Sequence, residues 1–133
     1  MKLKDSINQV VCWANDKDYV VLFEKDGDDS VDCCSKVISI KSTNVLETQL
    51  YVLLHECGHI LIDENSSVFN FKEVYCSFGE KSKTYKSFRI MEEVEAWKRG
   101  RTLADRLYID INQEKWDRAV ARAIYKYMEW AVS

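Results

Sequence analysis

Apolar residues recur at helical spacing in four stretches of the chain. The first stretch predicts a helix over about residues 2–15. The second has no proline and carries apolar residues on all sides, which predicts a central, buried helix from Val45 to Ile62. Two further helices are expected over about residues 88–107 and 112–131, and the last has an apolar face opposite a face rich in Lys and Arg.

Extended chain is predicted between the first two helices. Tyr19 to Phe23 is a continuous β-branched and aromatic run, typical of a buried strand. Asp26-Gly27-Asp28 has turn chemistry, and a second extended segment follows near Val31 to Ile40. We therefore expect an α+β fold in which a small antiparallel sheet packs on the central helix and two C-terminal helices follow. The 133 residues, 47% of them hydrophobic, are enough for a single domain over residues 1–133 with its own core.

Both histidines of the chain lie in the predicted central helix, in the sequence His55-Glu56-Cys57-Gly58-His59, which reads as HExxH. Residues four apart share one face of a helix, so both imidazoles can bind one metal ion while Glu56 reaches a water on that ion. This spacing is typical of zinc metallopeptidases. It predicts a hydrolase with His55 and His59 as Zn²⁺ ligands and Glu56 as the catalytic base.

The histidine pair also has a simpler interpretation, as two core side chains bonded to backbone carbonyl groups. Buried polar groups cost free energy unless they are paired, and one bound cation would pair both imidazoles. The position of His55 and His59 in an apolar helix therefore favours a metal site.

A catalytic zinc site usually has three protein ligands and one open position for water. Because the chain has no third histidine, the third ligand must be a carboxylate or a thiolate. Glu93 is the preferred candidate, Glu92 is the second choice, and Glu95 lies on a charged helix face. Glu93 shares its face with apolar and small residues that would let its helix approach the central one: Ile90, Ala96, Trp97, Gly100 and Ala104.

Other assignments stay open. The acids of this segment could simply solvate the helix surface, and Cys76 is a possible thiolate ligand in a weakly patterned stretch. Asp63, one turn beyond His59, could ligate or orient an imidazole, although its place at the helix end favours a capping or supporting role. Adjacent Cys33 and Cys34 could form a soft-metal or redox site, but buried strand cysteines are the simpler interpretation.

The stretch between the central helix and the next one has mixed signals. Phe69, Phe71 and Val74 hint at a short strand. Ser77 to Ser87 is rich in Lys, Ser and Gly, which predicts a mobile loop with fast amide exchange.

Composition narrows the class of protein. A net charge of −3 and a pI near 5.4 do not suggest a nucleic-acid binder, although basic residues prevail in the C-terminal part. Five cysteines without a CxxC pair fit reduced thiols better than a disulfide framework. Charged residues among the first five replace the apolar run of a signal peptide, and no segment has the roughly 20 apolar residues of a membrane span. We expect a soluble, cytoplasmic protein without membrane contact.

Three segments together resemble the ImmA/IrrE-type metallopeptidases of phages, mobile elements and bacteria. They are the extended segment Val37 to Lys41, the helix with the HExxHxL segment His55 to Leu61, and Glu93-Val94-Glu95-Ala96 in the next helix. In that family a glutamate three residues before an alanine is the third zinc ligand, which maps onto Glu93 and implies a gluzincin-like site. The resemblance covers roughly residues 37–105 and is specific only at HExxHxL.

This chain departs from the family pattern after the third ligand. The family continues with Asn and later a proline-containing run, whereas here Trp97-Lys98-Arg99 follows and the chain has no proline. The subfamily and the substrate therefore stay open. Family members are often encoded beside a repressor-like DNA-binding protein that they cleave or inactivate, so the resemblance implies a protein partner.

Two main functions follow. The first is a zinc endopeptidase in which Glu56 activates a water to hydrolyse a peptide bond of a protein partner. The second is a zinc-binding regulatory protein that sequesters a partner, such as a transcription regulator, without cleaving it. Glu56 favours catalysis, because holding zinc does not require it; a metal-free structural domain would follow only if no metal binds. Tyr75, Tyr85 or Arg89 could stabilise the oxyanion, and a sheet edge at Val37 to Ile40 could pair with a substrate strand.

Overall fold

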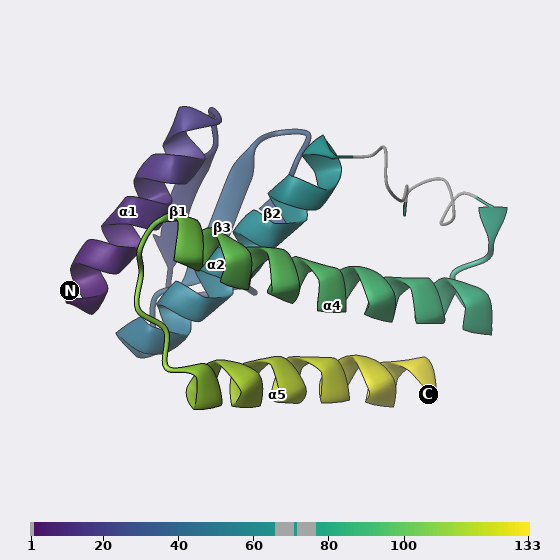
Figure 1. The fold of residues 1–133 in the computed structure, drawn as a ribbon. Helices are drawn as coiled ribbons and strands as arrows, with labels where there is room; N and C mark the ends of the chain where they lie inside the picture. Colours follow the sequence, from purple (N-terminus) through teal and green to yellow (C-terminus); the bar gives the residue numbers. More distant parts are fainter. Residues whose placement is uncertain (1, 66–70, 72–76) are drawn as a thin grey trace.

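The computed structural model describes residues 2–65, 71 and 77–133, and it confirms the predicted α+β class (Figure 1). Two C-terminal helices follow a central helix, as predicted. The elements in chain order are α1 (Leu3–Asp16), β1 (Val20–Glu24), β2 (Ser30–Asp32), β3 (Val37–Lys41), α2 (Leu46–Glu64), α4 (Lys83–Arg106) and α5 (Gln113–Ala131). No helix among the described residues is long and apolar enough to cross a membrane.

The sheet is mixed, so the prediction of a wholly antiparallel sheet is wrong. The strand order is β1-β3-β2, with β2 antiparallel and β1 parallel to β3. The segment predicted as one extended run from Val31 to Ile40 contains a tight turn, because the Asp32 carboxylate accepts hydrogen bonds from the backbone N–H groups of Cys34 and Ser35. This turn pairs β2 with β3, and β1 occupies the remaining edge of β3.

The first strand also differs from its prediction as a buried strand. β1 is an edge strand and most of its residues are exposed, including Val20 at 53% and Phe23 at 41%. Only Tyr19, just before β1, is buried. A run of β-branched and aromatic residues indicates an extended backbone, but its burial depends on what packs against it.

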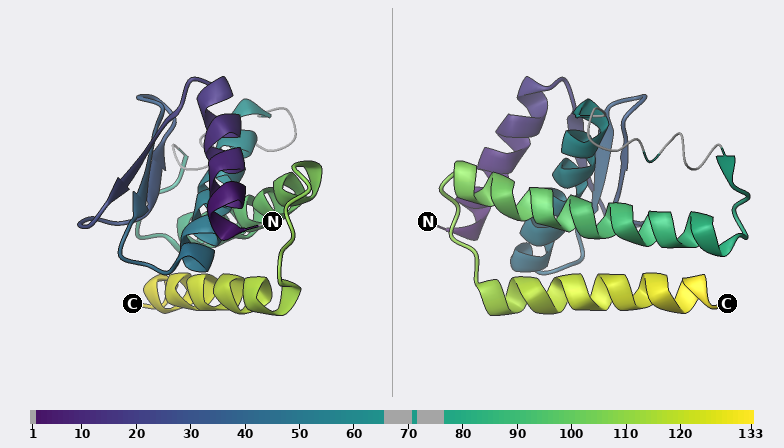
Figure 2. Two further views of the ribbon diagram at one scale, coloured as in Figure 1. Left: turned by 90° about the vertical axis from the view of Figure 1, so that its left-hand side faces the viewer. Right: turned by 45° about the vertical axis from the view of Figure 1, so that its right-hand side comes forward.

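Helix α2 is the centre of the core, as its apolar sequence predicts. Leu50, Leu53, Leu54, Cys57 and Ile60 are at most 1% exposed. Helices α1 and α2 lie against the sheet on the same face, and α4 crosses α2 (Figures 1 and 2). The face of α2 that carries the histidines is turned toward α4.

Two glycines allow α2 and α4 to touch along their backbones. A Cβ atom on Gly58 would lie 1.9 Å from the carbonyl oxygen of Ala96, and one on Gly100 would lie 2.4 Å from that of Leu54. Any other residue at either position would force the helices apart. The predicted stripe of small residues on α4 thus does make a close contact, and Gly58 supplies the matching surface on α2.

Helix α4 begins at Lys83, five residues before the predicted start. The Ser82 hydroxyl accepts a hydrogen bond from the Tyr85 backbone N–H and caps the helix, so the predicted loop ends at Ser82. Phe71 is helical rather than extended. Phe69 and Val74, the other residues of the predicted short strand, lie outside the described residues.

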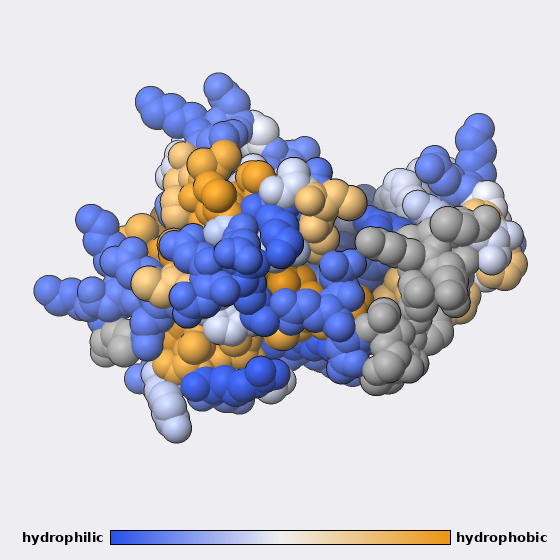
Figure 3. All heavy atoms as spheres, turned by 90° about the horizontal axis from the view of Figure 1, so that it is seen from above, coloured by the Kyte–Doolittle hydropathy of each residue, from blue (hydrophilic) through white to orange (hydrophobic). Residues whose placement is uncertain are grey.

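Helix α5 lies alongside α4 and is mostly exposed. Trp116 is its one buried residue, and it is anchored between Tyr51 of α2 and Trp97 of α4 with ring centroids 5.2 Å apart in both pairs. The opposite side of the molecule, seen from above and away from α5, is mainly hydrophilic, with apolar groups between the charged ones (Figure 3). Trp116 thus anchors the first turn of α5 to α2 and α4.

Candidate metal centre

Three side chains from two helices converge in the way the sequence predicts. His55 and His59 are one turn apart on α2, Glu93 comes from α4, and one ligand atom from each lies within 4.8 Å of the others. His55 Nε2 is 2.7 Å from Glu93 Oε2, and His59 Nε2 is 3.4 Å from that oxygen. Ligands about 2.0–2.2 Å from a tetrahedral ion lie roughly 3.3 Å from one another, so this donor set fits a metal ion.

Each imidazole turns its other ring nitrogen toward a second carboxylate. His55 Nδ1 is 3.3 Å from Glu56 Oε1, and His59 Nδ1 is 3.3 Å from Glu92 Oε1. Histidines that bind metals usually have such a partner, which fixes the ring and its tautomer. Glu92, the second-choice ligand, is therefore placed as the outer partner of His59.

Burial and charge act against each other on the triad. Burial alone would lower the pKa of His59, but hydrogen bonds to Glu92 and Glu93 outweigh it and raise that pKa to about 10. The pKa of His55 is raised in the same way, since bonds to Glu56 and Glu93 outweigh the effect of burial. For Glu93 burial would raise the pKa, yet the bonds from both histidines hold it far below its usual value. Without a metal ion, these pKa shifts favour protonated imidazoles beside an ionised Glu93 carboxylate.

Aromatic rings hold His55 from the side of α4. The Trp97 ring stacks on the His55 imidazole, with ring centroids 4.3 Å apart and planes 15° from parallel. Trp116 of α5 then packs edge-on against Trp97. The Trp97 Nε1 atom is buried and has no hydrogen-bond partner among the described residues. His55 is thus oriented by a stack that begins in α5.

Tyr127 on α5 is a site residue that the sequence interpretation missed. Its hydroxyl donates a hydrogen bond of 3.0 Å to Glu93 Oε1. Burial and the negative charge of Glu93 raise the pKa of Tyr127 well above its usual value of 10.0, so the phenol keeps its proton. The apolar pattern places Tyr127, unlike Tyr125, on the apolar face of the last helix, but that position indicates packing and not a contact with Glu93.

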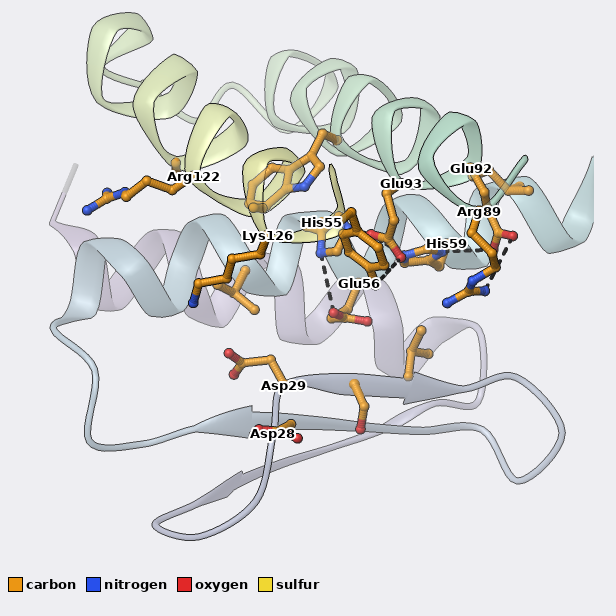
Figure 4. Close-up of a pocket in the computed structure, with 18 of the residues that line it drawn as sticks. Asp28, Asp29, His55, Glu56, His59, Arg89, Glu92, Glu93, Arg122 and Lys126 are labelled. Carbon is orange, nitrogen blue, oxygen red and sulfur yellow. Dashed lines mark hydrogen bonds and ion pairs between the residues drawn. The ribbon is translucent and has the colours of Figure 1, made fainter. Parts of the chain in front are cut away.

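The triad opens into a cleft of about 1820 Å³ that is bounded by α2, α4, α5 and the hairpin of β2 and β3. Figure 4 shows Glu56 beside His55 in this cleft, with Arg122 and Lys126 on the α5 side and Asp28 and Asp29 on the hairpin side. Glu56 is only 5% exposed. The triad and Glu56 therefore lie at the inner wall of the cleft.

The sheet edge beside the site is β2. The prediction of an exposed edge at Val37 to Ile40 is wrong, because that segment is β3, which pairs with a strand on both sides. β2 lines the cleft through Ser30, Val31 and Asp32. Any strand added to the sheet next to the triad would pair with β2.

The other residues that the sequence suggested for the site lie at different distances from the triad. Arg89 lines the cleft and lies 3.8 Å from Glu92, whereas Tyr85 is in the first turn of α4 and is not among the described residues of the cleft wall. Asp63 lines the cleft but does not belong to the triad. Tyr75 and Cys76 lie outside the described residues.

The two adjacent cysteines are not buried in a strand, so that interpretation is wrong. Cys33 and Cys34 form part of the turn after β2, where Cys33 is half-buried and Cys34 is exposed. Both line the cleft. They follow directly on Asp32, whose carboxylate organises the turn.

Comparison with known proteins finds no matching protein family, no matching curated protein and no matching solved structure.

Proposed function

We propose that this protein is a zinc-dependent metallopeptidase that hydrolyses a peptide bond in a protein or peptide substrate. His55, His59 and Glu93 would hold the Zn²⁺ ion. The observation that carries the proposal is the convergence of these three donors inside a cleft, with both imidazoles backed by carboxylates. A merely structural triad would not need an open cleft beside it.

We assign Glu56, the carboxylate beside His55, the role of general base. Zinc, when bound, would acidify a water molecule and polarise the scissile carbonyl group. Glu56 would accept the proton of the attacking water and pass it to the leaving amine. Its carboxylate lines the same cleft as the three proposed ligands, which supports this role.

The substrate would bind as an extended segment along β2. This strand pairs with β3 on one side only and lines the cleft next to the triad. A peptide strand can add to such an edge through backbone hydrogen bonds, which provide affinity without a fixed sequence. A repressor-like regulator, as the family resemblance implies, would have to present a flexible segment to this edge.

A reducing compartment such as the cytoplasm fits this function. None of the four described cysteines forms a disulfide, and two of them line the cleft. Cysteines that form no disulfide are typical of proteins in a reducing environment.

The decisive experiment replaces Glu56 by Gln, which keeps the shape of the side chain and removes the base. Cleavage products of a proteome-derived peptide library, and of the regulator encoded nearby, would be measured by mass spectrometry. Cleavage should fall by about 10²-fold or more while zinc content stays at one ion per chain. The matched control is Glu64→Gln on the same helix, since Glu64 is exposed and bonded to Lys17 away from the cleft.

The alternative function predicts a different result. If Glu56→Gln processes the regulator as well as the parent protein does, or if neither cleaves it while both bind it, the peptidase proposal is wrong. A protein that sequesters its partner through the zinc site would then be the correct description.

A further inference from the structure

The last helix supplies a direct contact to the triad. The Tyr127 hydroxyl donates to Glu93 Oε1 over 3.0 Å, while the other oxygen, Oε2, faces His55 Nε2 at 2.7 Å. The two oxygens of one carboxylate thus have different principal partners, although His59 Nε2 is near both. Figure 4 shows the Glu93 side chain pointing from α4 toward His55 and His59.

A carboxylate that binds a metal through one oxygen leaves the other oxygen to be satisfied. In the interior this second oxygen needs a donor, since an unpaired buried acceptor costs free energy. Glu93 is 4% exposed, so bulk water has little access to it. Among the described residues that bond Glu93, Tyr127 is the only one that does not belong to the triad.

Contacts at both ends of α5 hold the helix, and with it Tyr127, in place. The beginning of the helix is anchored by the buried Trp116. Near its end, Trp130 packs edge-on against the Tyr127 ring with centroids 6.1 Å apart, and Lys86 of α4 lies over Trp130. The phenol is therefore a positioned donor, unlike Tyr125, which is 63% exposed on the same helix.

We propose that Tyr127 is a positioning residue of the metal centre, which holds Glu93 so that its Oε2 atom is directed at the metal ion. In this assignment α5 is an integral part of the site. The inference rests on the proposed zinc site but does not require peptidase activity.

The test measures metal binding in Tyr127→Phe, which removes the hydroxyl and keeps the ring. Zinc affinity, from competition with a chromogenic chelator, should fall by about 10- to 100-fold, the usual effect of losing such a partner. The Co²⁺-substituted protein should show a shifted d–d absorption band, because the ligand field of Glu93 changes. Tyr125→Phe should match the parent in both measurements. Circular dichroism of the metal-free variants verifies that the fold is kept.

A double-mutant cycle separates positioning from a general structural effect. If Tyr127 acts through Glu93, its replacement should have no further effect on zinc affinity in a Glu93→Ala background, where the ion is bound more weakly through the two histidines. Equal zinc affinities for Tyr127→Phe and Tyr125→Phe, or an undiminished Tyr127 effect without the Glu93 carboxylate, would overturn the inference.

The same experiment distinguishes the two proposals. A parent protein that binds no zinc overturns the metal site and the role of Tyr127 together. A parent that binds zinc and loses it on Tyr127→Phe, but cleaves no substrate, overturns only the peptidase function.

Discussion

Gly58 of α2 lies against the backbone of Ala96 of α4, so closely that a Cβ atom at position 58 would be 1.9 Å from the Ala96 carbonyl oxygen. Gly58 is next to His59, and Ala96 is three residues after Glu93. The contact therefore sets the distance across which the two helices present their metal-binding side chains. The second x of HExxH has a packing role in this chain.

Gly58→Ala should accordingly destabilise the protein and weaken metal binding. Alanine favours a helix over glycine by about 1 kcal/mol, but the backbone clash forces the helices apart, and overpacking of this kind costs about 1–3 kcal/mol or more. We expect a net loss of roughly 2 kcal/mol in the free energy of unfolding by urea, together with lower zinc affinity.

Gly79→Ala is the control, because a Cβ atom there would meet nothing within 4 Å. Its stability should stay close to that of the parent. Equal unfolding midpoints for the two alanine variants would show that α2 and α4 can separate without cost.

The three acids of the α4 segment should have graded effects on zinc affinity. Glu93→Ala removes a ligand and should have the largest effect. Glu92→Ala removes the outer partner of His59 and should weaken binding by about 10- to 100-fold. Glu95 forms an ion pair of 2.9 Å with Arg99 at the surface, so Glu95→Ala should leave zinc affinity unchanged. Isothermal titration of the three variants would give the order, and a larger loss for Glu92 than for Glu93 would exchange their roles.

Zinc binding should require both histidines. His55→Ala or His59→Ala should each abolish stoichiometric zinc, because either change leaves only two of the three donors. Metal analysis of the purified variants is the measurement. Tight binding that survives in both would place the metal elsewhere.

The stability of the protein should depend on pH in opposite ways with and without zinc. In the metal-free protein, the raised pKa values of His55 and His59 stabilise the fold below the usual imidazole value of 6.5, and this is lost as the pH rises toward the His59 pKa of about 10. The lowered pKa of Glu93 contributes above its usual 4.5 and is lost as the pH falls. In the metal-free protein, the triad should therefore contribute most to stability between pH 4.5 and pH 6.5.

With zinc present, stability should instead rise with pH above the neutral range, since both imidazoles must lose their protons to bind the ion. The increase in Tm caused by zinc should grow between about pH 6 and about pH 8. Differential scanning calorimetry with zinc and with a chelator would measure it. An increase that is the same at both pH values would contradict proton displacement from the histidines.

The start of α4 can be tested separately. Ser82→Ala removes the side-chain cap on the Tyr85 N–H and should cost about 1 kcal/mol in the free energy of unfolding. Ser87→Ala is the control, because the Ser87 hydroxyl bonds only to a carbonyl group of its own helix. Amide exchange should be fast before Ser82 and slower from Lys86 onward, where the backbone N–H groups bond within the helix. An equal loss of stability in both variants would show that the Ser82 cap does not stabilise the start of α4.

Local periodicity was sufficient for the features that depend on neighbours in sequence. The four-residue spacing of His55 and His59 puts them on one helix face wherever that helix lies. The apolar surroundings of α2 required burial, and the small, apolar flanks of Glu93 distinguished it from Glu92 and Glu95. These conclusions use only the geometry of an isolated helix, which the sequence by itself determines.

Contacts between distant parts of the chain were decided only by the tertiary structure. The parallel pairing of β1 with β3, the bond between Tyr127 and Glu93, and the place of Glu92 behind His59 join residues that are 17 to 34 positions apart. No periodicity encodes such partners, because many pairings of these elements would bury similar apolar area. The backbone contact at Gly58, the turn at Asp32 and the anchor at Trp116 select one of them, and with it the geometry of the candidate site.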